Sequence, residues 1–543
     1  MPRLVRCLGI AFAVILLASV PLAVAAQDAP AGAESFWWNE RVFYQIFVRS
    51  FYDSDGDGTG DFQGLIQKLD YLNDGDPSTS TDLGINGIWL MPIMASPSEH
   101  GYDITDYYAV NPDYGTVDDF RQFIDAAHQR GIAVIIDLVI NHTSEHHPWF
   151  LASRNRDPQY ADYYVWSDTD PGFRGPESQT VWHRKGDRFV YGVFNGLIPD
   201  LNFTNPAVTA EMYAIAEFWL EEMGVDGFRV DAVKYIIEEG RALEHTVSTH
   251  DWLAAFHSHI RAINPDALLV GEIWDSTSTV VRYVGGEMDI AFEFDLAVSM
   301  VRSATFALSG TLVRGLEPVL RAYPPGQYAT FLTNHDQDRL FSQAQNNLNS
   351  ARLGAAFLLT TPGVPFVYYG EEIAMEGKRT LPSTDNERRT PMQWKDSANA
   401  GFTSGTPWFP INASFHDFNV AELQADPASV LNLYRDLIQL RVRTPALQSG
   451  GFTLITSASR KVLAFARHTA GQTVIVLVNT DDAPVLDYAL SGTLPITSVS
   501  GALSLYGYDH PGVPELAADG SFTAYQPFSE LPPFTVMIYE LFE

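Results

Sequence analysis

Short hydrophobic runs alternate along the chain with longer stretches in which hydrophobic residues recur every three to four positions. Runs such as GIAVIIDLVINH (131–142) and GVDGFRVDAV (224–233) are largely apolar, which is typical of strands buried on both faces. The stretches 116–130 and 205–223 have the period of amphipathic helices. This alternation predicts a parallel sheet, and eight such runs predict a closed (β/α)8 TIM barrel, with an open doubly wound sheet as the alternative.

Two parts of the chain depart from this alternation. From 142 to 206 the chain carries many aromatic, Gly and Pro residues without a clear helix, which predicts a small domain inserted after the third strand. After 446 the runs become short and alternating, as in TVIVLVNT (473–480), which predicts a separate antiparallel β-sandwich. The predicted domains are the barrel in two parts (36–141 and 207–446), the inserted domain (142–206) and the C-terminal β domain (447–543).

The first 26 residues have the pattern of a secretory signal peptide. Arg3 and Arg6 precede a long apolar run, small residues at 23–26 offer a cleavage site, and no stop-transfer pattern follows. The sequence therefore predicts an exported protein, extracellular or periplasmic, whose signal peptide (1–26) is removed. Cys7 is the only cysteine, so the exported chain would contain no disulfide.

The overall charge limits the classes of partner. A formal net charge of −32 and a pI near 4.6 argue against nucleic acid and anionic membranes. A neutral substrate is compatible with this charge. The aromatic content of 13% is high, which also suits sugar binding, because sugar rings stack on aromatic faces.

The stretch DSDGDGTGDFQG (53–64) resembles the start of a calcium-binding loop. Glycines between the acidic residues let the backbone fold tightly around a cation. The twelfth position, where an EF-hand loop has a closing glutamate, is Gly64, and no second loop follows. From the residues alone, a structural calcium site and a solvated turn both remain open. The candidate ligands are the carboxylates of Asp53, Asp55, Asp57 and Asp61 and the backbone carbonyl of Thr59.

Polar residues follow several predicted strands, at the end where a barrel of this kind carries its functional residues. Arg229 and Asp231 lie two positions apart and so share one face of the fourth strand. Each candidate alone fits a strand-end ion pair or cap, but together they predict a catalytic mouth. The other candidates are Asp137, Asn141 and His142 after the third strand, Glu272 after the fifth, and His335 and Asp336 after the seventh.

Several carboxylates and an arginine at one mouth fit retaining glycoside hydrolysis. One carboxylate attacks the sugar, and a second, protonated carboxyl group donates a proton to the leaving oxygen. Arg229 beside Asp231 favours the ionised form of that carboxylate. Glu272 is flanked by Ile273 and Trp274, and an apolar setting raises the pKa of a carboxyl group.

Four motifs occur in order on separate predicted strands: DLVINH, GFRVDAVKY, GEIW and FLTNHD. In these motifs, and from about residue 36 to the C-terminus, the chain resembles the α-amylase family of glycoside hydrolases (family 13). The resemblance implies Asp231 as nucleophile, Glu272 as acid/base and Asp336 as transition-state stabiliser. It also implies sugar contacts at the cleavage point from Tyr102, His142, Arg229 and His335.

The resemblance also bears on calcium. Members of the oligo-1,6-glucosidase type carry a similar acidic loop after the first strand, which implies a structural calcium ion at 53–61. A second calcium site, typical of α-amylases, would lie between the barrel and the inserted domain and use Asn141 and Asp200. Those enzymes have histidine where this chain has Tyr235, so the second site is left open.

The residues around the nucleophile point to two branches of the family. Ala232 and Lys234 resemble α-amylases, and we expect the Lys234 ammonium on the leaving-group side, within reach of sugar hydroxyls. The acidic loop and IPDLN (198–202) resemble the glucosidase branch, as does Glu99, which keeps exo action open. We therefore expect a secreted enzyme that hydrolyses α-1,4 bonds in starch or maltooligosaccharides. An α-glucosidase, an oligo-1,6-glucosidase or a glucosyl or maltosyl transferase is the alternative, and a non-catalytic sugar-binding protein is the alternative of another class.

Overall fold

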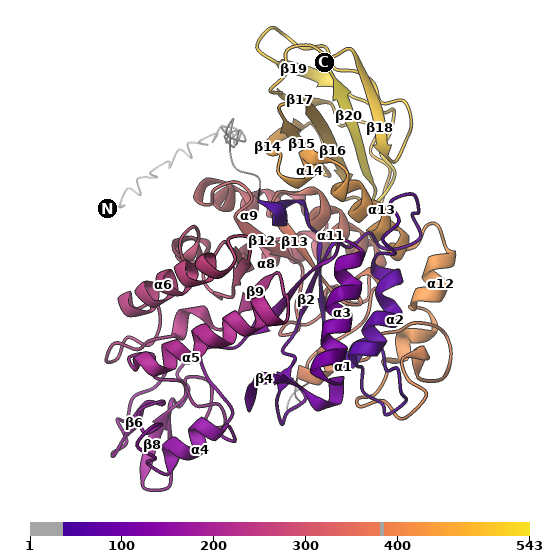
Figure 1. Ribbon diagram of the computed structural model, residues 1–543. Coiled ribbons are helices and arrows are strands. Elements are labelled where there is room, and N and C mark those ends of the chain that lie inside the picture. The colour runs from indigo at the N-terminus through magenta and orange to yellow at the C-terminus, as the bar shows by residue number, and fades with distance from the viewer. Residues whose placement is uncertain (1–35, 381–384) are drawn as a thin grey trace, which may run out of the picture.

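The computed structural model describes residues 36–380 and 385–543, so the predicted signal peptide lies outside the described residues. Within these ranges, eight parallel strands close into a barrel (Figure 1), which confirms the predicted fold class. In order around the barrel, the strands are β1 (Phe43–Ile46), β2 (Gly87–Leu90), β5 (Ala133–Leu138), β9 (Gly227–Val230), β10 (Leu268–Gly271), β11 (Ile290–Phe292), β12 (Tyr328–Phe331) and β13 (Val364–Tyr368).

All residues of these eight strands are buried, as their continuous hydrophobic runs predict. Large aromatic side chains fill the barrel interior, where Phe43 stacks on Phe366 with ring centroids 4.6 Å apart. The main helices outside the strands are α2 (Phe62–Leu72), α3 (Val117–Gln129), α5 (Pro206–Glu217), α6 (Val247–Ile263), α8 (Phe294–Phe306), α9 (Ser309–Ala322), α11 (Leu348–Thr360) and α13 (Val430–Val442).

Helix starts follow the local sequence. At α3, the Thr116 hydroxyl accepts from the Asp119 N–H while the Asp119 carboxylate accepts from the Thr116 N–H, which is a reciprocal capping box. Asp61 caps α2 by accepting from the Gly64 N–H. None of the described helices combines the length and the hydrophobicity needed to cross a bilayer.

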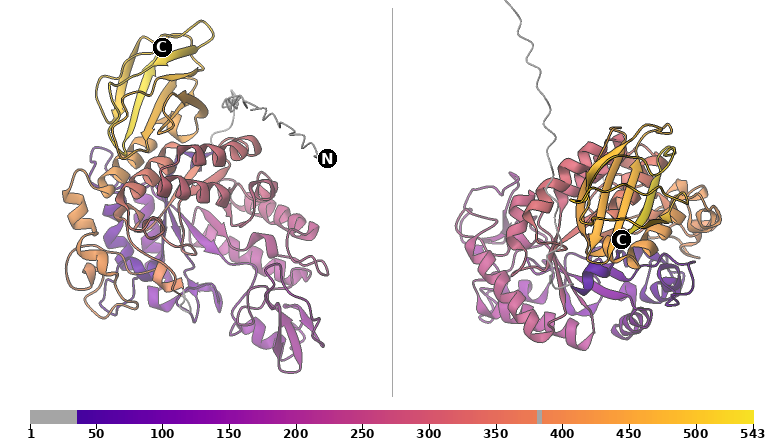
Figure 2. Two further views of the ribbon diagram at one scale, coloured as in Figure 1. Left: turned by 180° about the vertical axis from the view of Figure 1, so that it is seen from behind. Right: turned by 90° about the horizontal axis from the view of Figure 1, so that it is seen from above.

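Between β5 and α5 lies a small subdomain with its own sheet. It contains α4 (Pro148–Arg154) and a sheet in the order β6 (Trp166–Ser167), β8 (Arg188–Tyr191) and β7 (Trp182–Lys185), antiparallel throughout. A further hairpin, β3 (Met94–Ala95) and β4 (Asp106–Val110), follows β2. Figure 1 shows the subdomain on the opposite side of the barrel from the C-terminal domain, and the left view of Figure 2 agrees.

The C-terminal domain is antiparallel, as predicted, and its described strands form one continuous sheet rather than two separate ones. Strand β14 joins its two parts, because residues 451–455 pair with β15 and residues 456–457 pair with β17. Side chains of both parts share one buried hydrophobic cluster, which includes Ile475 of β16 and Leu490 of β17. The order is β18 (Gly501–Tyr506), β20 (Val536–Phe542), β16 (Gln472–Asn479), β15 (Val462–Thr469), β14 (Gly451–Ser457), β17 (Leu490–Thr493) and β19 (Ser521–Tyr525).

Two buried arginines hold the turn between α11 and β13, and one of them, Arg467, reaches it from the C-terminal domain. Arg441 of α13 donates to the carbonyls of Leu359, Thr361 and Gly363, in the turn between α11 and β13. Arg467 of β15 donates to the Thr360 carbonyl in the same turn and to two carbonyls at the start of β14. The carbonyls of this turn are thus satisfied by side chains that lie far away in the sequence.

Replacing Arg467 with Met should destabilise the protein, because three buried carbonyls would lose their donors. We expect a loss of about 2–4 kcal/mol and a lower midpoint of thermal unfolding. The matched control is Arg460→Met, which changes an exposed arginine just before the same strand. Equal melting temperatures for the two variants would contradict the assigned role.

Candidate active site

The candidate catalytic residues meet at the carboxyl ends of neighbouring strands. Asp137 of β5 is paired in register with Arg229 of β9, and Asp231 directly follows β9. Glu272 directly follows β10, which pairs with the other edge of β9. His335 and Asp336 follow β12 across the mouth. The barrel therefore brings the predicted residues of separate motifs together.

Arg229 lies at the centre of the mouth and is almost fully buried, at 1% exposed. One terminal nitrogen contacts Asp137 Oδ1 at 2.5 Å and Asp231 Oδ1 at 2.7 Å. Its other terminal nitrogen lies 3.0 Å from Glu272 Oε2. A single cation thus faces three carboxyl groups in a setting where water screens their charges poorly.

Burial and mutual repulsion set the protonation of these carboxyl groups. Burial raises the pKa of Glu272 to about 7. The Arg229 guanidinium opposes this rise, and the Asp231 carboxylate adds to it. Burial also raises the pKa of Asp231 to about 6. The Arg229 guanidinium opposes this rise, and the Asp137 carboxylate adds to it. Glu272 is therefore the group that retains a proton more readily, as an acid catalyst requires.

Asp336 has a different environment. Burial favours its neutral form, but His335, Arg389 and Arg229 favour the ionised form, and the pKa falls below its usual value. Arg389 holds Asp336 Oδ1 at 2.8 Å. The sequence did not identify Arg389, because it lies in a loop beyond β13 and belongs to none of the four motifs. Its neighbour Arg388 is also an arginine, so residue type alone did not single it out.

His335 and Tyr102 form a hydrogen-bonded pair at the floor of the site. The Gln45 side-chain amide lies 2.7 Å from His335 Nδ1, and His335 Nε2 lies 2.6 Å from the Tyr102 hydroxyl. That hydroxyl donates to Asp137 at 3.2 Å. Burial lowers the pKa of His335 to about 3, so its ring is neutral at pH 7. Gln45, which the sequence gave no reason to select, completes this chain of contacts.

His142 is also buried and neutral. Burial lowers its pKa to about 3, and within the described part of the chain its Nε2 has no hydrogen-bond partner. A buried polar atom without a partner costs free energy, which a substrate hydroxyl would recover. The geometry of His142 is therefore suited to contact a sugar.

The Lys234 ammonium is held by protein groups. It lies 2.9 Å from Glu244 Oε2 and 3.7 Å from Asp275 Oδ2, and it donates to the Trp274 carbonyl at 3.2 Å. Its side chain is only 12% exposed. The structure thus places the Lys234 ammonium against the loop that follows Glu272, the candidate acid/base residue.

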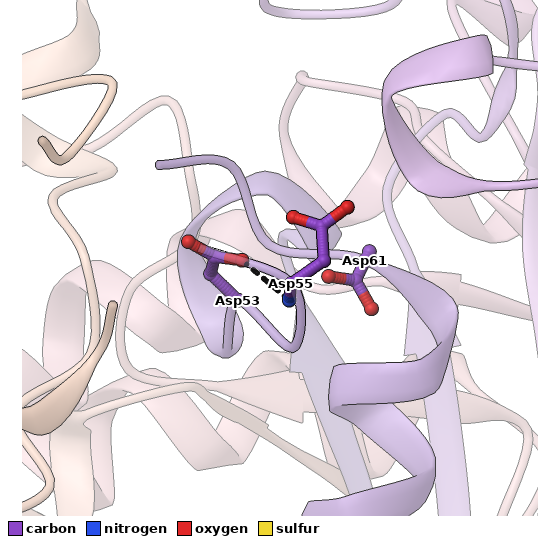
Figure 3. Close-up of side chains that lie close together, drawn as sticks. All are labelled: Asp53, Asp55 and Asp61. Atoms are coloured by element: carbon purple, nitrogen blue, oxygen red, sulfur yellow. Dashed lines mark hydrogen bonds between the residues drawn. The ribbon is translucent and has the colours of Figure 1, made fainter. Parts of the chain in front are cut away.

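The acidic loop brings three of its four predicted carboxylates together. One carboxylate oxygen from each of Asp53, Asp55 and Asp61 lies within 4.8 Å of the other two. Figure 3 shows these three side chains close together in the loop. Asp57 instead accepts from the Thr59 N–H. Burial raises the pKa of Asp57, and the nearby Asp55 and Asp53 carboxylates add to it. Oxygen-only donors with several negative charges fit a hard cation such as calcium.

The predicted second cation site has unpaired oxygens. Asn141 Oδ1, Asp200 Oδ2 and Glu238 Oε1 are buried without hydrogen-bond partners among the described residues. Burial raises the pKa of Asp200, and the charge of Glu238 adds to this rise. Burial likewise raises the pKa of Glu238 to about 8. These oxygens also fit a hard cation. Sequence reasoning missed Glu238, because it follows the fourth strand outside any motif.

A closed (β/α)8 barrel with carboxyl groups clustered around an arginine at its mouth is an arrangement that suits the hydrolysis or transfer of glycosidic bonds. The family description "Alpha amylase, catalytic domain" matches residues 45–450. The chain therefore belongs to the α-amylase family, whose members hydrolyse or transfer glycosidic bonds.

Proteins similar to this chain are named for more than one enzyme activity. Alpha-amylase 3 of Dictyoglomus thermophilum is 37% identical over 82% of this chain and 85% of its own length. Oligo-1,6-glucosidase of Parageobacillus thermoglucosidasius is 32% identical over 82% of this chain and 91% of its own. The crystal structure of the alpha-amylase from H. orenii matches with a TM-score of 0.80 at 39% identity, over 92% of this chain and 99% of that one. Similarity thus extends to both branches that the sequence suggested.

The two raised pKa values predict a bell-shaped pH dependence of kcat/KM. Activity should rise as the Asp231 carboxyl group, with a pKa of about 6, loses its proton and becomes nucleophilic. It should fall as Glu272, with a pKa of about 7, loses the proton it must donate. On an activated aryl maltoside, Glu272→Gln should keep the acidic limb and lose the alkaline limb. An alkaline limb that persists in this variant would contradict the assignment of Glu272.

Proposed function

We propose that this protein is a secreted retaining glycoside hydrolase that cleaves α-1,4-glucosidic bonds in starch or maltooligosaccharides. The observation that carries the proposal is the cluster of Asp231 and Glu272 around Arg229 at the carboxyl ends of the adjacent strands β9 and β10, which brings together the two carboxyl groups that a double displacement needs. Secretion is supported by the N-terminal pattern of basic, apolar and small residues.

Each residue has a distinct part in the proposed double displacement. Asp231 attacks the anomeric carbon while Glu272 donates its proton to the leaving oxygen, and Glu272 then removes a proton from the attacking water. Asp336, kept ionised by Arg389, stabilises the positive charge that develops on the sugar. Tyr102, His142 and His335 are neutral groups available to bond sugar hydroxyls, and together with Arg229 they are the proposed sugar contacts.

The substrate class rests on charge and on the residues beside the nucleophile. A neutral glucan is compatible with an acidic protein. Ala232, a small residue directly after Asp231, supports α-1,4 action, as does the similarity to proteins named as alpha-amylases.

An α-glucosidase, an oligo-1,6-glucosidase or a glucosyl or maltosyl transferase is the second candidate. Its support is the oligo-1,6-glucosidase relative and Glu99, which accepts from the Asn386 side chain at 3.0 Å. A non-catalytic sugar-binding protein is disfavoured, because Asp231, Glu272 and Asp336 are all present.

The products of maltopentaose distinguish these candidates. Early products should be maltose and maltotriose, released as α-anomers, when followed by chromatography and anomer-resolved NMR. Glucose alone would support the α-glucosidase, and products longer than the substrate would support a transferase. β-Anomers would contradict the retaining mechanism.

Removing the nucleophile should abolish turnover without unfolding the protein. Asp231→Asn keeps the shape of the side chain, so we expect a loss of about 10³-fold or more in kcat with a melting temperature close to wild type. As a control, Asp226→Asn changes a carboxylate at the opposite end of the same strand. The assignment would be wrong if Asp231→Asn kept more than about a tenth of wild-type activity.

We also propose that the acidic loop holds a structural calcium ion through Asp53, Asp55 and Asp61. Such an ion would supply positive charge to three clustered carboxylates and stabilise the start of α2, which Asp61 caps. Asp57 and Thr59, which the sequence pattern included, remain further ligand candidates. For a second ion, the unpaired oxygens of Asn141 and Asp200 are the candidate ligands.

Calcium should raise the melting temperature, and a chelator should lower it, because the ion binds the folded loop. Asp55→Asn should remove most of this response. The matched control is Asp76→Asn, since Asp76 accepts from the N–H two residues on, as Asp55 does, but lies outside the cluster. If neither calcium nor the chelator changed the melting temperature of the wild-type protein, the acidic loop would be only a turn.

A further inference from the structure

Gln45 is a buried amide that the proposed chemistry leaves without a role. It lies on β1 and is only 1% exposed. Its side-chain nitrogen lies 2.7 Å from His335 Nδ1, in the segment that follows β12. His335 is fully buried as well, so each of these two side chains depends on protein groups for its hydrogen bonds.

The other ring nitrogen of His335 faces two oxygens. Nε2 lies 2.6 Å from the Tyr102 hydroxyl and 3.1 Å from Asp336 Oδ2. The pKa of Asp336 is below its usual value, so its carboxylate is ionised at pH 7 and can only accept. The Tyr102 hydroxyl gives its one proton to Asp137, so it also accepts toward the ring. Two acceptors at Nε2 place the ring proton on that nitrogen.

A proton on Nε2 determines what Nδ1 requires. A neutral imidazole has one N–H and one lone pair, so Nδ1 of His335 is then a buried acceptor that needs a donor. The side-chain amide of Gln45 supplies an N–H at this place. A carboxylate in the same position would accept instead and would draw a second proton onto the ring. The neutral amide therefore favours an uncharged ring with its proton on Nε2.

Charges around the ring show why this matters for the reaction. Burial opposes protonation of His335, and Arg389, Arg229 and His100 add to this effect, while Asp336 favours protonation. The sugar gains positive charge in the transition state of glycosidic cleavage. A charged imidazolium beside it would repel that charge, whereas a neutral ring still offers an N–H to an oxygen.

We propose that Gln45 is a positioning residue that fixes the proton of His335 on Nε2 and keeps the ring uncharged, so that its N–H points toward Asp336 and the sugar. This inference rests on the proposed function, because it takes Asp336 and the sugar to meet at this place. Gln45 acts only through His335 and is given no sugar contact of its own.

The wild-type protein tests the position of the proton directly. In NMR of protein labelled with ¹⁵N in the histidine rings, protonated and unprotonated nitrogens give separate signals, and those of His335 are the ones lost in His335→Gln. We expect a protonated Nε2 and an unprotonated Nδ1 from about pH 5 to pH 8, because the pKa of His335 is about 3. A proton on Nδ1 would overturn the proposal.

Two variants test the role of Gln45 in the reaction. Gln45→Glu keeps the shape but replaces the donor with an acceptor, so Nδ1 should become protonated too. Its kcat on maltopentaose should fall by about 10- to 100-fold while KM changes far less, since the repulsion acts in the transition state. Gln45→Met removes the donor without adding charge and should lose less activity. Wild-type ring signals or wild-type kcat in Gln45→Glu would overturn the role.

The matched control is Gln393→Met, at a second fully buried glutamine, whose amide donates to the Phe418 carbonyl. This variant should melt at a lower temperature than wild type but keep the wild-type ring signals of His335. The same change of those signals in both Met variants would mean a general loss of stability and would overturn the role of Gln45. The ring signals are read without substrate. If they were as expected and the wild-type enzyme did not cleave maltopentaose, the proposed function would be wrong while the proton position would stand.

Discussion

The contact between Arg229 and three carboxyl groups is the constraint on which the site depends. Burying Asp137, Asp231 and Glu272 together without a cation would be too costly for all three to ionise. Burial raises the pKa values of all three carboxyl groups, their mutual repulsion adds to the rise, and the single guanidinium opposes it only in part. Asp137 also accepts hydrogen bonds from Trp89 and Tyr102, which suits it to remain the fixed anchor of the cluster.

The barrel makes this contact possible. Adjacent parallel strands β5, β9 and β10 end at the same rim, so side chains from separate motifs reach one arginine. The strands are buried on both faces, and aromatic side chains pack their interior, which leaves the rim little freedom to relax. A rigid rim keeps the carboxyl groups close despite their repulsion.

Loops complete what the strands begin. Arg389 reaches Asp336 from a loop beyond β13, and Lys234 reaches the carbonyl of Trp274 from the turn after β9. These contacts place charge and aromatic surface around the rim of the barrel. Differences in such loops, on one scaffold, are a physical basis for different specificities among relatives named as amylases and glucosidases.

The sequence by itself determined the parallel sheet, whose closure into a barrel it favoured, together with the antiparallel C-terminal domain and the rim positions of Asp231 and Glu272. Continuous apolar runs are typical of strands buried on both faces, and residues just past parallel strands share one rim. Only the tertiary structure decided that Arg389 pairs with Asp336, and that β14 joins both parts of the C-terminal sheet. It also decided which charges act on the pKa of Glu272, whose rise the apolar neighbours in the sequence had predicted. These features depend on contacts between distant segments and on the exclusion of water, and neither leaves a periodic pattern in the chain.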